Sequence, residues 1–229
     1  MAYTRATVPS YNPAMNSSLP LIIYIHGFNS SPASAKAQQF IAACQQRADI
    51  SLEVPELPHD PRMAIEALEN LVKDARAGVH LLVGSSLGGY YATYLADKHG
   101  CRAALVNPAV SPVKHLGDGF IGMQKNLYTG EEYEFTREFA EFLDTLDVES
   151  PVLPENFLVL LQTRDEVLDY RLAVERYRGS VQVVQDGGSH RFENFSRVVP
   201  AILAFADEGV LAQDMLEEIR RFVPEQDMH

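Results

Sequence analysis

Residues 79–96 read VHLLVGSSLGGYYATYLA, and this stretch decides the fold class. An apolar run typical of a buried strand leads into Gly84-Ser85-Ser86-Leu87-Gly88, and a helix-like stretch follows. G-x-S-x-G between a strand and a helix is the sequence form of a nucleophile elbow, a sharp turn that lifts a serine hydroxyl above a sheet. The glycines suit the turn because a Cβ at either position would collide with the neighbouring strand and helix.

Two adjacent serines, Ser85 and Ser86, compete for the role of nucleophile. Only Ser86 has glycine two residues before and two residues after it, so we predict Ser86. The alternative interpretation is a Gly-Ser turn that merely caps the following helix.

The rest of the chain alternates short apolar runs with helical patterns. We expect strands at residues 19–25, 51–55, 79–83, 103–106, 157–161 and 181–184. We expect helices at residues 34–46, from 61 onward, at 90–96 and at 195–205. This alternation predicts an α/β fold with a mostly parallel sheet flanked by helices.

The length of 229 residues fits one sizeable domain, which we place at residues 19–207. We expect residues 1–18 to form a flexible N-terminal arm and residues 208–229 a C-terminal helix or tail. Residues 111–155 are too long for an ordinary connection, and apolar positions in 134–146 recur at helical spacing. We interpret this segment as a short helical cap insertion over the active site. A helical excursion packed on the body is the alternative, and the two are compatible.

Composition limits the classes of partner. With 31 acidic and 19 basic residues, the formal charge of −12 argues against a broad nucleic-acid-binding surface. No apolar run has the length needed to cross a bilayer, and the first 18 residues lack the pattern of a signal peptide. Cys44 and Cys101 lack metal-ligand spacing. We therefore expect a soluble, cytoplasmic protein that uses no metal and binds neither nucleic acid nor membrane.

A serine nucleophile needs a base, and the base needs an orienting carboxylate. With an elbow of this kind, the expected chain order is Ser, then Asp or Glu, then His. His190 follows the strand at 181–184 in a glycine-rich turn, and Asp165 follows the strand at 157–161. We predict these two as base and acid. Glu166 is the nearest rival to Asp165, whereas Asp169 is better explained as a helix cap.

An oxyanion hole completes such a site. One donor is expected to be the backbone N–H of Leu87, directly after the nucleophile, and the other that of Phe28. Gly27 allows the tight backbone that this second donor requires. His26 precedes the nucleophile in the chain, so we interpret it as a structural residue of the same loop.

These motifs together resemble the α/β-hydrolase superfamily and, more closely, the YqiA-like esterases. The matching segments are residues 21–32 (LIIYIHGFNSSP), 83–92 (VGSSLGGYYA), 105–109 (LVNPA), 165–170 (DEVLDY) and 187–190 (GGSH). The resemblance implies a compact α/β-hydrolase fold. It also implies hydrolysis of a small carboxylic ester or thioester by Ser86, His190 and Asp165, without a cofactor.

Two positions depart from the pattern of that family. Arg164 stands where the family usually has glycine before the acid, which would strain the backbone if φ were positive there. Ser189 replaces the Asp or Asn common before the histidine.

Three other functions remain open at this stage. The chain is either an esterase, a non-catalytic relative that serves as a binding protein, or an acyltransferase or cofactor-free haloperoxidase on the same elbow. The sequence does not reveal the acyl-chain length or the oligomeric state. Five side chains form either an acyl site or part of the core: Phe28, Phe120, Met123, Leu127 and Tyr128.

Overall fold

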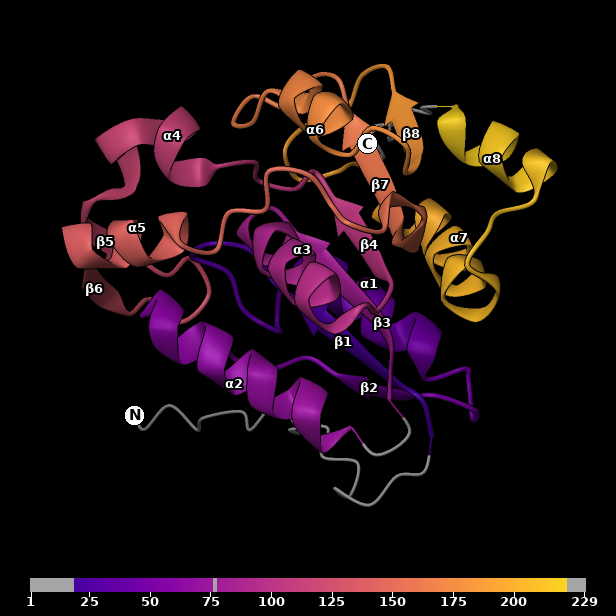
Figure 1. Cartoon of the computed structure of the whole chain (residues 1–229), viewed down its shortest axis with the longest axis horizontal. Coiled ribbons are helices and arrows are strands. Elements are labelled where there is room, and N and C mark those ends of the chain that lie inside the picture. The colour runs from indigo at the N-terminus through magenta and orange to yellow at the C-terminus, as the bar shows by residue number, and fades with distance from the viewer. Residues whose placement is uncertain (1–18, 76–77, 222–229) are drawn as a thin grey trace, which may run out of the picture.

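The computed structural model describes residues 19–75 and 78–221. Its centre is a six-stranded sheet in the order β2-β1-β3-β4-β7-β8, in which every neighbouring pair is parallel (Figure 1). The strands are β1 (Leu21–Ile25), β2 (Ser51–Glu53), β3 (Val79–Ser85), β4 (Ala103–Val106), β7 (Phe157–Gln162) and β8 (Val181–Gln185). The six strands that the sequence predicts are therefore present, with ends that shift by no more than two residues.

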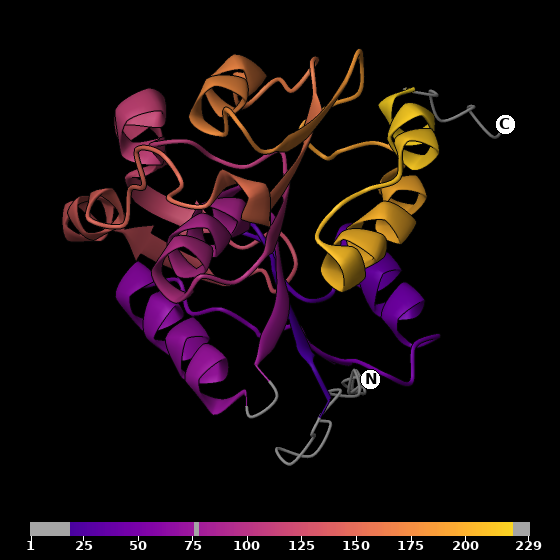
Figure 2. The same ribbon diagram turned by 45° about the vertical axis from the view of Figure 1, so that its right-hand side comes forward.

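Helices cover both faces of this sheet (Figure 2). One face carries α2 (Pro61–Asp74), α3 (Leu87–His99), α5 (Arg137–Asp144) and α6 (Tyr170–Arg176). The other face carries α1 (Ala35–Cys44), α7 (Phe195–Glu208) and α8 (Gln213–Arg220). The prediction of a mostly parallel sheet flanked by helices is confirmed.

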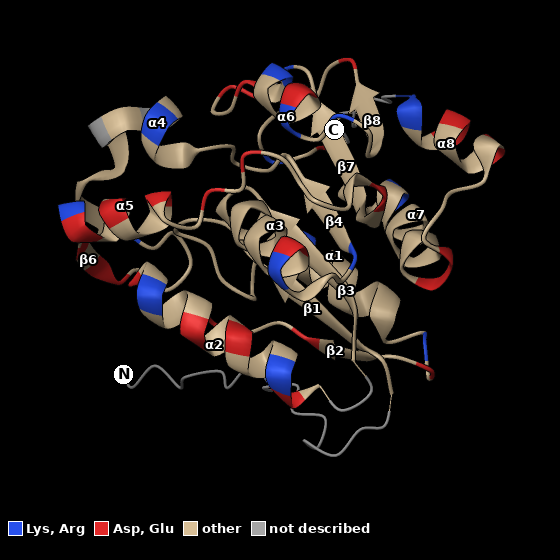
Figure 3. Ribbon diagram, viewed as in Figure 1, with Lys and Arg blue, Asp and Glu red and all other residues tan. Residues whose placement is uncertain are grey.

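The burial of strand side chains explains this layering. Along β1, Ile23 and Ile25 enter one hydrophobic core, whereas Ile22 and Tyr24 enter the other, because successive side chains of a strand point to opposite faces. Strands β1, β3, β4, β7 and β8 contain no Lys, Arg, Asp or Glu. Charged residues lie instead on the helices, on the connecting loops, on the edge strand β2 and in residues 122–135 (Figure 3).

Helix α2 begins as its sequence predicts. The Asp60 side chain accepts a hydrogen bond from the backbone N–H of Arg62 at 2.9 Å, and Pro61 occupies the first helical position. Asp169 caps α6 in the same way, at 3.0 Å from the N–H of Arg171.

The segment 111–155 contains more than the expected helix. It forms α4 (Pro112–Leu116), a 3-10 turn η1 (Gly117–Phe120), a hairpin of β5 (Gly122–Lys125) and β6 (Glu132–Phe135), helix α5 and a second 3-10 turn, η2 (Pro154–Asn156). The helix expected at 134–146 begins only at Arg137, after Thr136 caps it by accepting from the N–H of Phe139. Glu134 and Phe135 belong to β6. The sequence pattern misses this strand because four residues carry too few alternating positions to outweigh the helical pattern beside them.

Both chain ends bear on the remaining predictions. The N-terminal arm expected at 1–18 lies outside the described residues. Of the C-terminal stretch, helix α8 is present, and residues 222–229 lie outside the described range. In the described ranges, no helix combines the length and the apolar composition that a bilayer crossing requires.

The parallel arrangement matters for the site. Because all six strands run in one direction, their carboxyl ends meet at one edge of the sheet, where ligand sites of such sheets form. The loops that follow β1, β3, β4, β7 and β8 therefore gather there, and they contain the predicted site residues.

Candidate active site

Ser86 sits at the sharp turn between β3 and α3. Its backbone has φ 55° and ψ −122°, a conformation that costs a non-glycine residue about 1–3 kcal/mol. Two glycines permit the turn: a Cβ on Gly84 would overlap the carbonyl oxygen of Gly88, and a Cβ on Gly88 would overlap that of Ile25. The serine is thereby fixed at the carboxyl edge of the central strand.

The turn is also fastened to the loop after β4. The backbone N–H of Ser86 donates to the Val106 carbonyl at 3.1 Å, and the Ser86 carbonyl accepts from the N–H of Ala109 at 3.1 Å. These two bonds span the junction between β3 and β4, so the strained serine has little freedom to relax.

The structure brings the predicted nucleophile, base and acid into one row. The Nε2 atom of His190 lies 3.1 Å from the Oγ of Ser86. Its Nδ1 atom lies 2.9 and 3.0 Å from the two carboxylate oxygens of Asp165. With Nδ1 protonated and donating to the carboxylate, Nε2 of the neutral ring is free to accept the serine proton.

Asp165 is held by its own loop. Its side chain is only 2% exposed, and its Oδ1 accepts from the backbone N–H groups of Val167 at 2.9 Å and Leu168 at 2.8 Å. The rival Glu166 takes a different place: its carboxylate accepts from the backbone N–H of His190 at 2.9 Å, and this bond lowers the pKa of Glu166. The two neighbouring carboxylates thus hold the ring and the backbone of the same histidine.

Arg164 causes no backbone strain. It is absent from the non-glycine residues that have positive φ in the described chain, so the strain that its replacement of glycine suggested does not arise. Its backbone N–H donates to the carbonyl of Gly187 at 3.1 Å, which ties the loop that carries Asp165 to the loop that carries His190.

Two buried amides that the sequence analysis did not single out support the histidine loop. Gln162, at the end of β7, is fully buried, and its Oε1 accepts from the N–H groups of Ser189 at 3.0 Å and Glu193 at 2.9 Å. Asn107, with φ 40°, donates through Nδ2 to the carbonyl oxygens of Ser189 at 3.0 Å and His190 at 3.3 Å. The sequence does carry a signal for Gln162 and Asn107, since each is a polar residue at the end of an apolar strand.

Lys36 approaches the same loop from α1. Its Nζ donates to the carbonyl of Arg191, the residue after His190, at 2.8 Å. Burial lowers the pKa of Lys36 to about 8, although the nearby charge of Asp165 opposes that shift. Nothing in the sequence near residue 36 indicates this role, because the contact spans 155 positions.

The loop after β1 reaches the serine from the other side. A Cβ on Gly27 would lie only 3.2 Å from the Cβ of Ser86, so this loop passes directly against Ser86. The backbone N–H groups of Phe28 and Leu87 are the two predicted oxyanion donors. In the described part of the chain, neither donates a hydrogen bond to a backbone carbonyl in a turn or loop. Leu87 is also the first residue of α3, where the helix dipole favours negative charge.

His26 behaves as a structural residue. It is 5% exposed, its Nε2 accepts from the N–H of Leu57 at 3.4 Å, and its Nδ1 lies 3.1 Å from the Gly27 carbonyl. Burial lowers the pKa of His26, which keeps the imidazole neutral. The ring therefore links the loops after β1 and β2.

No group of three or more His, Cys, Asp or Glu side chains in the described ranges is arranged to hold a metal ion.

The fold resembles solved structures of α/β hydrolases. A putative hydrolase from Agrobacterium vitis S4 superposes with a TM-score of 0.67 at 18% identity, over 82% of this chain and 88% of that one. Est1E from Butyrivibrio proteoclasticus gives 0.66 at 17% identity, over 85% and 90%. The chain is thus an α/β-hydrolase-fold protein.

The sequence also assigns this chain to a family within that fold. The model of UPF0227, described as an uncharacterised protein family, matches residues 21–207, and the chain belongs to this family. A UPF0227 protein of Serratia proteamaculans (strain 568) is 29% identical over 190 residues, which is 81% of this chain and 98% of that protein. The UPF0227 protein YcfP of Salmonella arizonae is 26% identical over 196 residues, 82% of this chain and 100% of that protein.

Proposed function

We propose that this chain is a serine hydrolase that cleaves carboxylic esters, and acyl thioesters by the same chemistry, through an acyl-enzyme intermediate. The observation that carries the proposal is the row of hydrogen bonds from Ser86 Oγ through His190 to Asp165. Structural neighbours that include Est1E and the carboxylesterase CesB from Bacillus subtilis support the same class of reaction.

In the first half of the reaction, Ser86 Oγ attacks the ester carbonyl carbon and its proton passes to His190 Nε2. The carbonyl oxygen becomes an oxyanion, for which we assign the N–H groups of Phe28 and Leu87 as donors. Asp165 stabilises the imidazolium that forms and keeps the ring in one orientation. The intermediate collapses as His190 returns the proton to the leaving alcohol or thiol, which leaves the acyl group on Ser86.

In the second half, water takes the place of the alcohol. His190 removes a proton from the water as it attacks the acyl-enzyme carbonyl, and the same two N–H groups hold the second oxyanion. Collapse of this intermediate breaks the bond to Ser86 Oγ, which regains its proton from His190 and releases the carboxylic acid.

Replacement of the two adjacent serines tests the proposal. Ser86→Ala should lower kcat for p-nitrophenyl acetate by about 10⁶-fold, the size seen when a serine is removed from an assembled triad. Ser85→Ala is the matched control and should keep most of the activity. A fluorophosphonate probe should label the wild type and Ser85→Ala but not Ser86→Ala. Retention of turnover and labelling by the folded Ser86→Ala protein would refute the assignment.

A further inference from the structure

A small pocket lies beside Ser86, between the loop after β1 and the hairpin β5–β6. Gly27 and Phe28 line it from the loop, Leu87 and Tyr91 from α3, and Phe135 from β6. Its volume is about 30 Å³, room for one or two water-sized groups. Because Gly27 also packs against Ser86, the pocket adjoins the nucleophile.

The position of His190 tells which part of an ester belongs in this pocket. In the sheet order β2-β1-β3-β4-β7-β8, Ser86 follows β3, and the pocket lies over β1 and β2. His190 and Asp165 follow β8 and β7, on the other side of Ser86. The leaving group must lie beside His190, which returns a proton to it. The acyl group therefore points the other way, into the pocket.

Aromatic rings form the far wall of the pocket. The ring of Phe28 packs edge-on against Phe135, with centres 5.4 Å apart, and Phe135 is 1% exposed. The ring of His59 stacks on Tyr133, with centres 3.7 Å apart and planes 5° from parallel. These rings leave little depth for an alkyl chain.

The polar groups around the pocket already have partners in one another. The Tyr133 hydroxyl donates to Asn29 Oδ1 at 2.7 Å, and Asn29 Nδ2 donates to Gln124 Oε1 at 3.2 Å. The amide of Asn126 donates to the Ser30 carbonyl at 3.0 Å and accepts from two backbone N–H groups of its own turn. Because these side chains are already paired with one another, they offer few hydrogen-bonding groups to a substituent on an acyl chain, which suits an unsubstituted alkyl group.

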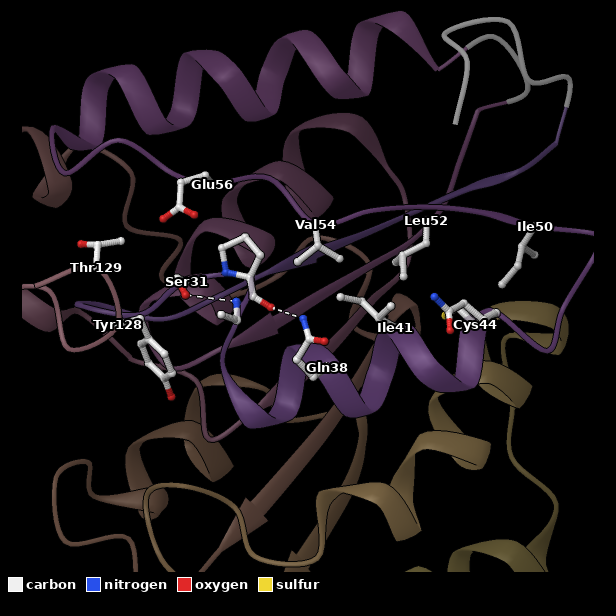
Figure 4. Close-up of a pocket in the computed structure, with 13 residues that line it drawn as sticks. Ser31, Gln38, Ile41, Cys44, Ile50, Leu52, Val54, Glu56, Tyr128 and Thr129 are labelled. Carbon is white, nitrogen blue, oxygen red and sulfur yellow. Dashed lines mark hydrogen bonds between the residues drawn. The ribbon is translucent and has the colours of Figure 1, made fainter. Parts of the chain in front are cut away.

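A larger groove lies next to the small pocket, across the loops after β1 and β2. It has a volume of about 410 Å³ and runs between α1 on one side and β2 with the loop after it on the other. Ile41 faces Val54 across the groove, and Tyr128 lies at one end (Figure 4). Consecutive residues separate the two spaces: Ser30 and Leu57 line the small pocket, and their neighbours Ser31 and Glu56 line the groove. Within the described chain, none of Ser86, Asp165 and His190 lines either space, but Gly27, which packs against Ser86, lines the small pocket and not the groove.

We infer that the substrates are esters of short, unsubstituted acyl chains of about two or three carbons, and that Tyr133 and Phe135 are the residues that limit chain length. This inference rests on the proposed function, because it takes Ser86 as the acylated atom. The hairpin β5–β6 is then the length-determining wall of the acyl site.

A chain-length series tests this inference. We would measure kcat/KM for p-nitrophenyl acetate, butanoate, hexanoate and octanoate with the wild type and with Tyr133→Ala and Phe135→Ala. Tyr133→Phe is the matched control that keeps the ring, and Tyr128→Ala removes an aromatic ring from the same hairpin turn outside the pocket. The octanoate-to-acetate ratio within one preparation does not depend on the folded fraction, so a partly unfolded variant still gives an answer.

Rejection of a single excess methylene can reach tenfold or more, so wild-type kcat/KM should fall at least tenfold from butanoate to octanoate. The octanoate-to-acetate ratio should rise about tenfold in Tyr133→Ala or Phe135→Ala, and stay within about twofold of wild type in both controls. A wild type that prefers octanoate, or a selective loss of octanoate turnover in Tyr128→Ala, would overturn the inference and place the chain in the larger groove. Absence of Ser86-dependent turnover on every ester would instead defeat the proposed function.

Discussion

The two loops that flank Ser86 are held in place by different kinds of contact. The loop after β8, which carries His190, rests on two buried side-chain amides. Gln162 and Asn107 together form hydrogen bonds with five backbone groups of this loop. In the loop after β1, Phe28 packs against aromatic rings of the hairpin and of η1, and hydrogen bonds from the hairpin hold its neighbours Asn29 and Ser30. Hydrogen bonds fix direction as well as distance, whereas ring packing tolerates small shifts.

This difference matches what each loop does in the proposed reaction. The imidazole must point at two partners within hydrogen-bond reach, which demands a single geometry. The loop after β1 supplies one backbone N–H and a wall of the pocket. Its role depends on the shape of that wall, which tolerates small shifts. We therefore expect substitutions around His190 to affect turnover more than equivalent substitutions around Phe28.

The largest effect should come from Asp165, the proposed acid. Asp165→Asn keeps the shape but turns one acceptor into a donor, so the imidazole loses its correct tautomer and kcat should fall by about 10⁴-fold. Glu166→Gln is the matched control: its side-chain carbonyl still accepts from the N–H of His190, and kcat should stay within about threefold of wild type. Steady-state kinetics on a p-nitrophenyl ester would decide. If Glu166→Gln lost more kcat than Asp165→Asn, Glu166 and not Asp165 would be the acid that orients His190.

The next effect tests the buried amides. Gln162→Leu leaves the N–H groups of Ser189 and Glu193 without an acceptor in the interior, a cost on the order of 3 kcal/mol in the free energy of unfolding. Displacement of His190 by about 1 Å should lower kcat by about 10²-fold. Urea unfolding and kcat measured on the same protein check both numbers. If kcat is unchanged, the amide network supports folding but not the orientation of the base.

A smaller effect is expected on the aromatic side. Tyr133→Phe removes the hydrogen bond to Asn29 but keeps the stack on His59, so the free energy of unfolding should fall by about 1 kcal/mol. Turnover should fall no more than about tenfold and equally for all acyl chains. A loss as large as that of Gln162→Leu would contradict the contrast between the two loops.

The smallest effect on turnover is expected at Lys36, where pH is the more informative variable. Its pKa in the folded protein is about 8, below the unfolded value near 10.5, so the unfolded chain binds more protons between these two pH values. Stability contributed by Lys36 should therefore rise as pH increases through this window. In Lys36→Met, the difference in unfolding free energy from wild type should shift accordingly, while kcat at pH 7 changes less than about fivefold. A pH-independent difference would mean that burial does not perturb this amine.

Much of this arrangement was predictable because it is local. The elbow requires glycine on both sides of Ser86, and the caps at Asp60 and Asp169 depend on residues two positions apart. The order of serine, acid and histidine, together with the strand ends, also pointed to Asp165 and His190. In contrast, the hairpin β5–β6 was missed, because two four-residue strands gain stability mainly from each other and from Phe28, which lies far away in the chain.

The amino-acid sequence by itself determined the alternation of strands and helices, the turn at Ser86 and the set of candidate groups, because each depends on neighbours within a few residues. Only the tertiary structure decided which groups meet. Gln162 beneath the histidine loop, Lys36 against Arg191 and Tyr133 against Asn29 join positions separated by 27 to 155 residues. Such contacts arise from the packing of parallel strands, which aligns their carboxyl ends irrespective of their distance along the chain.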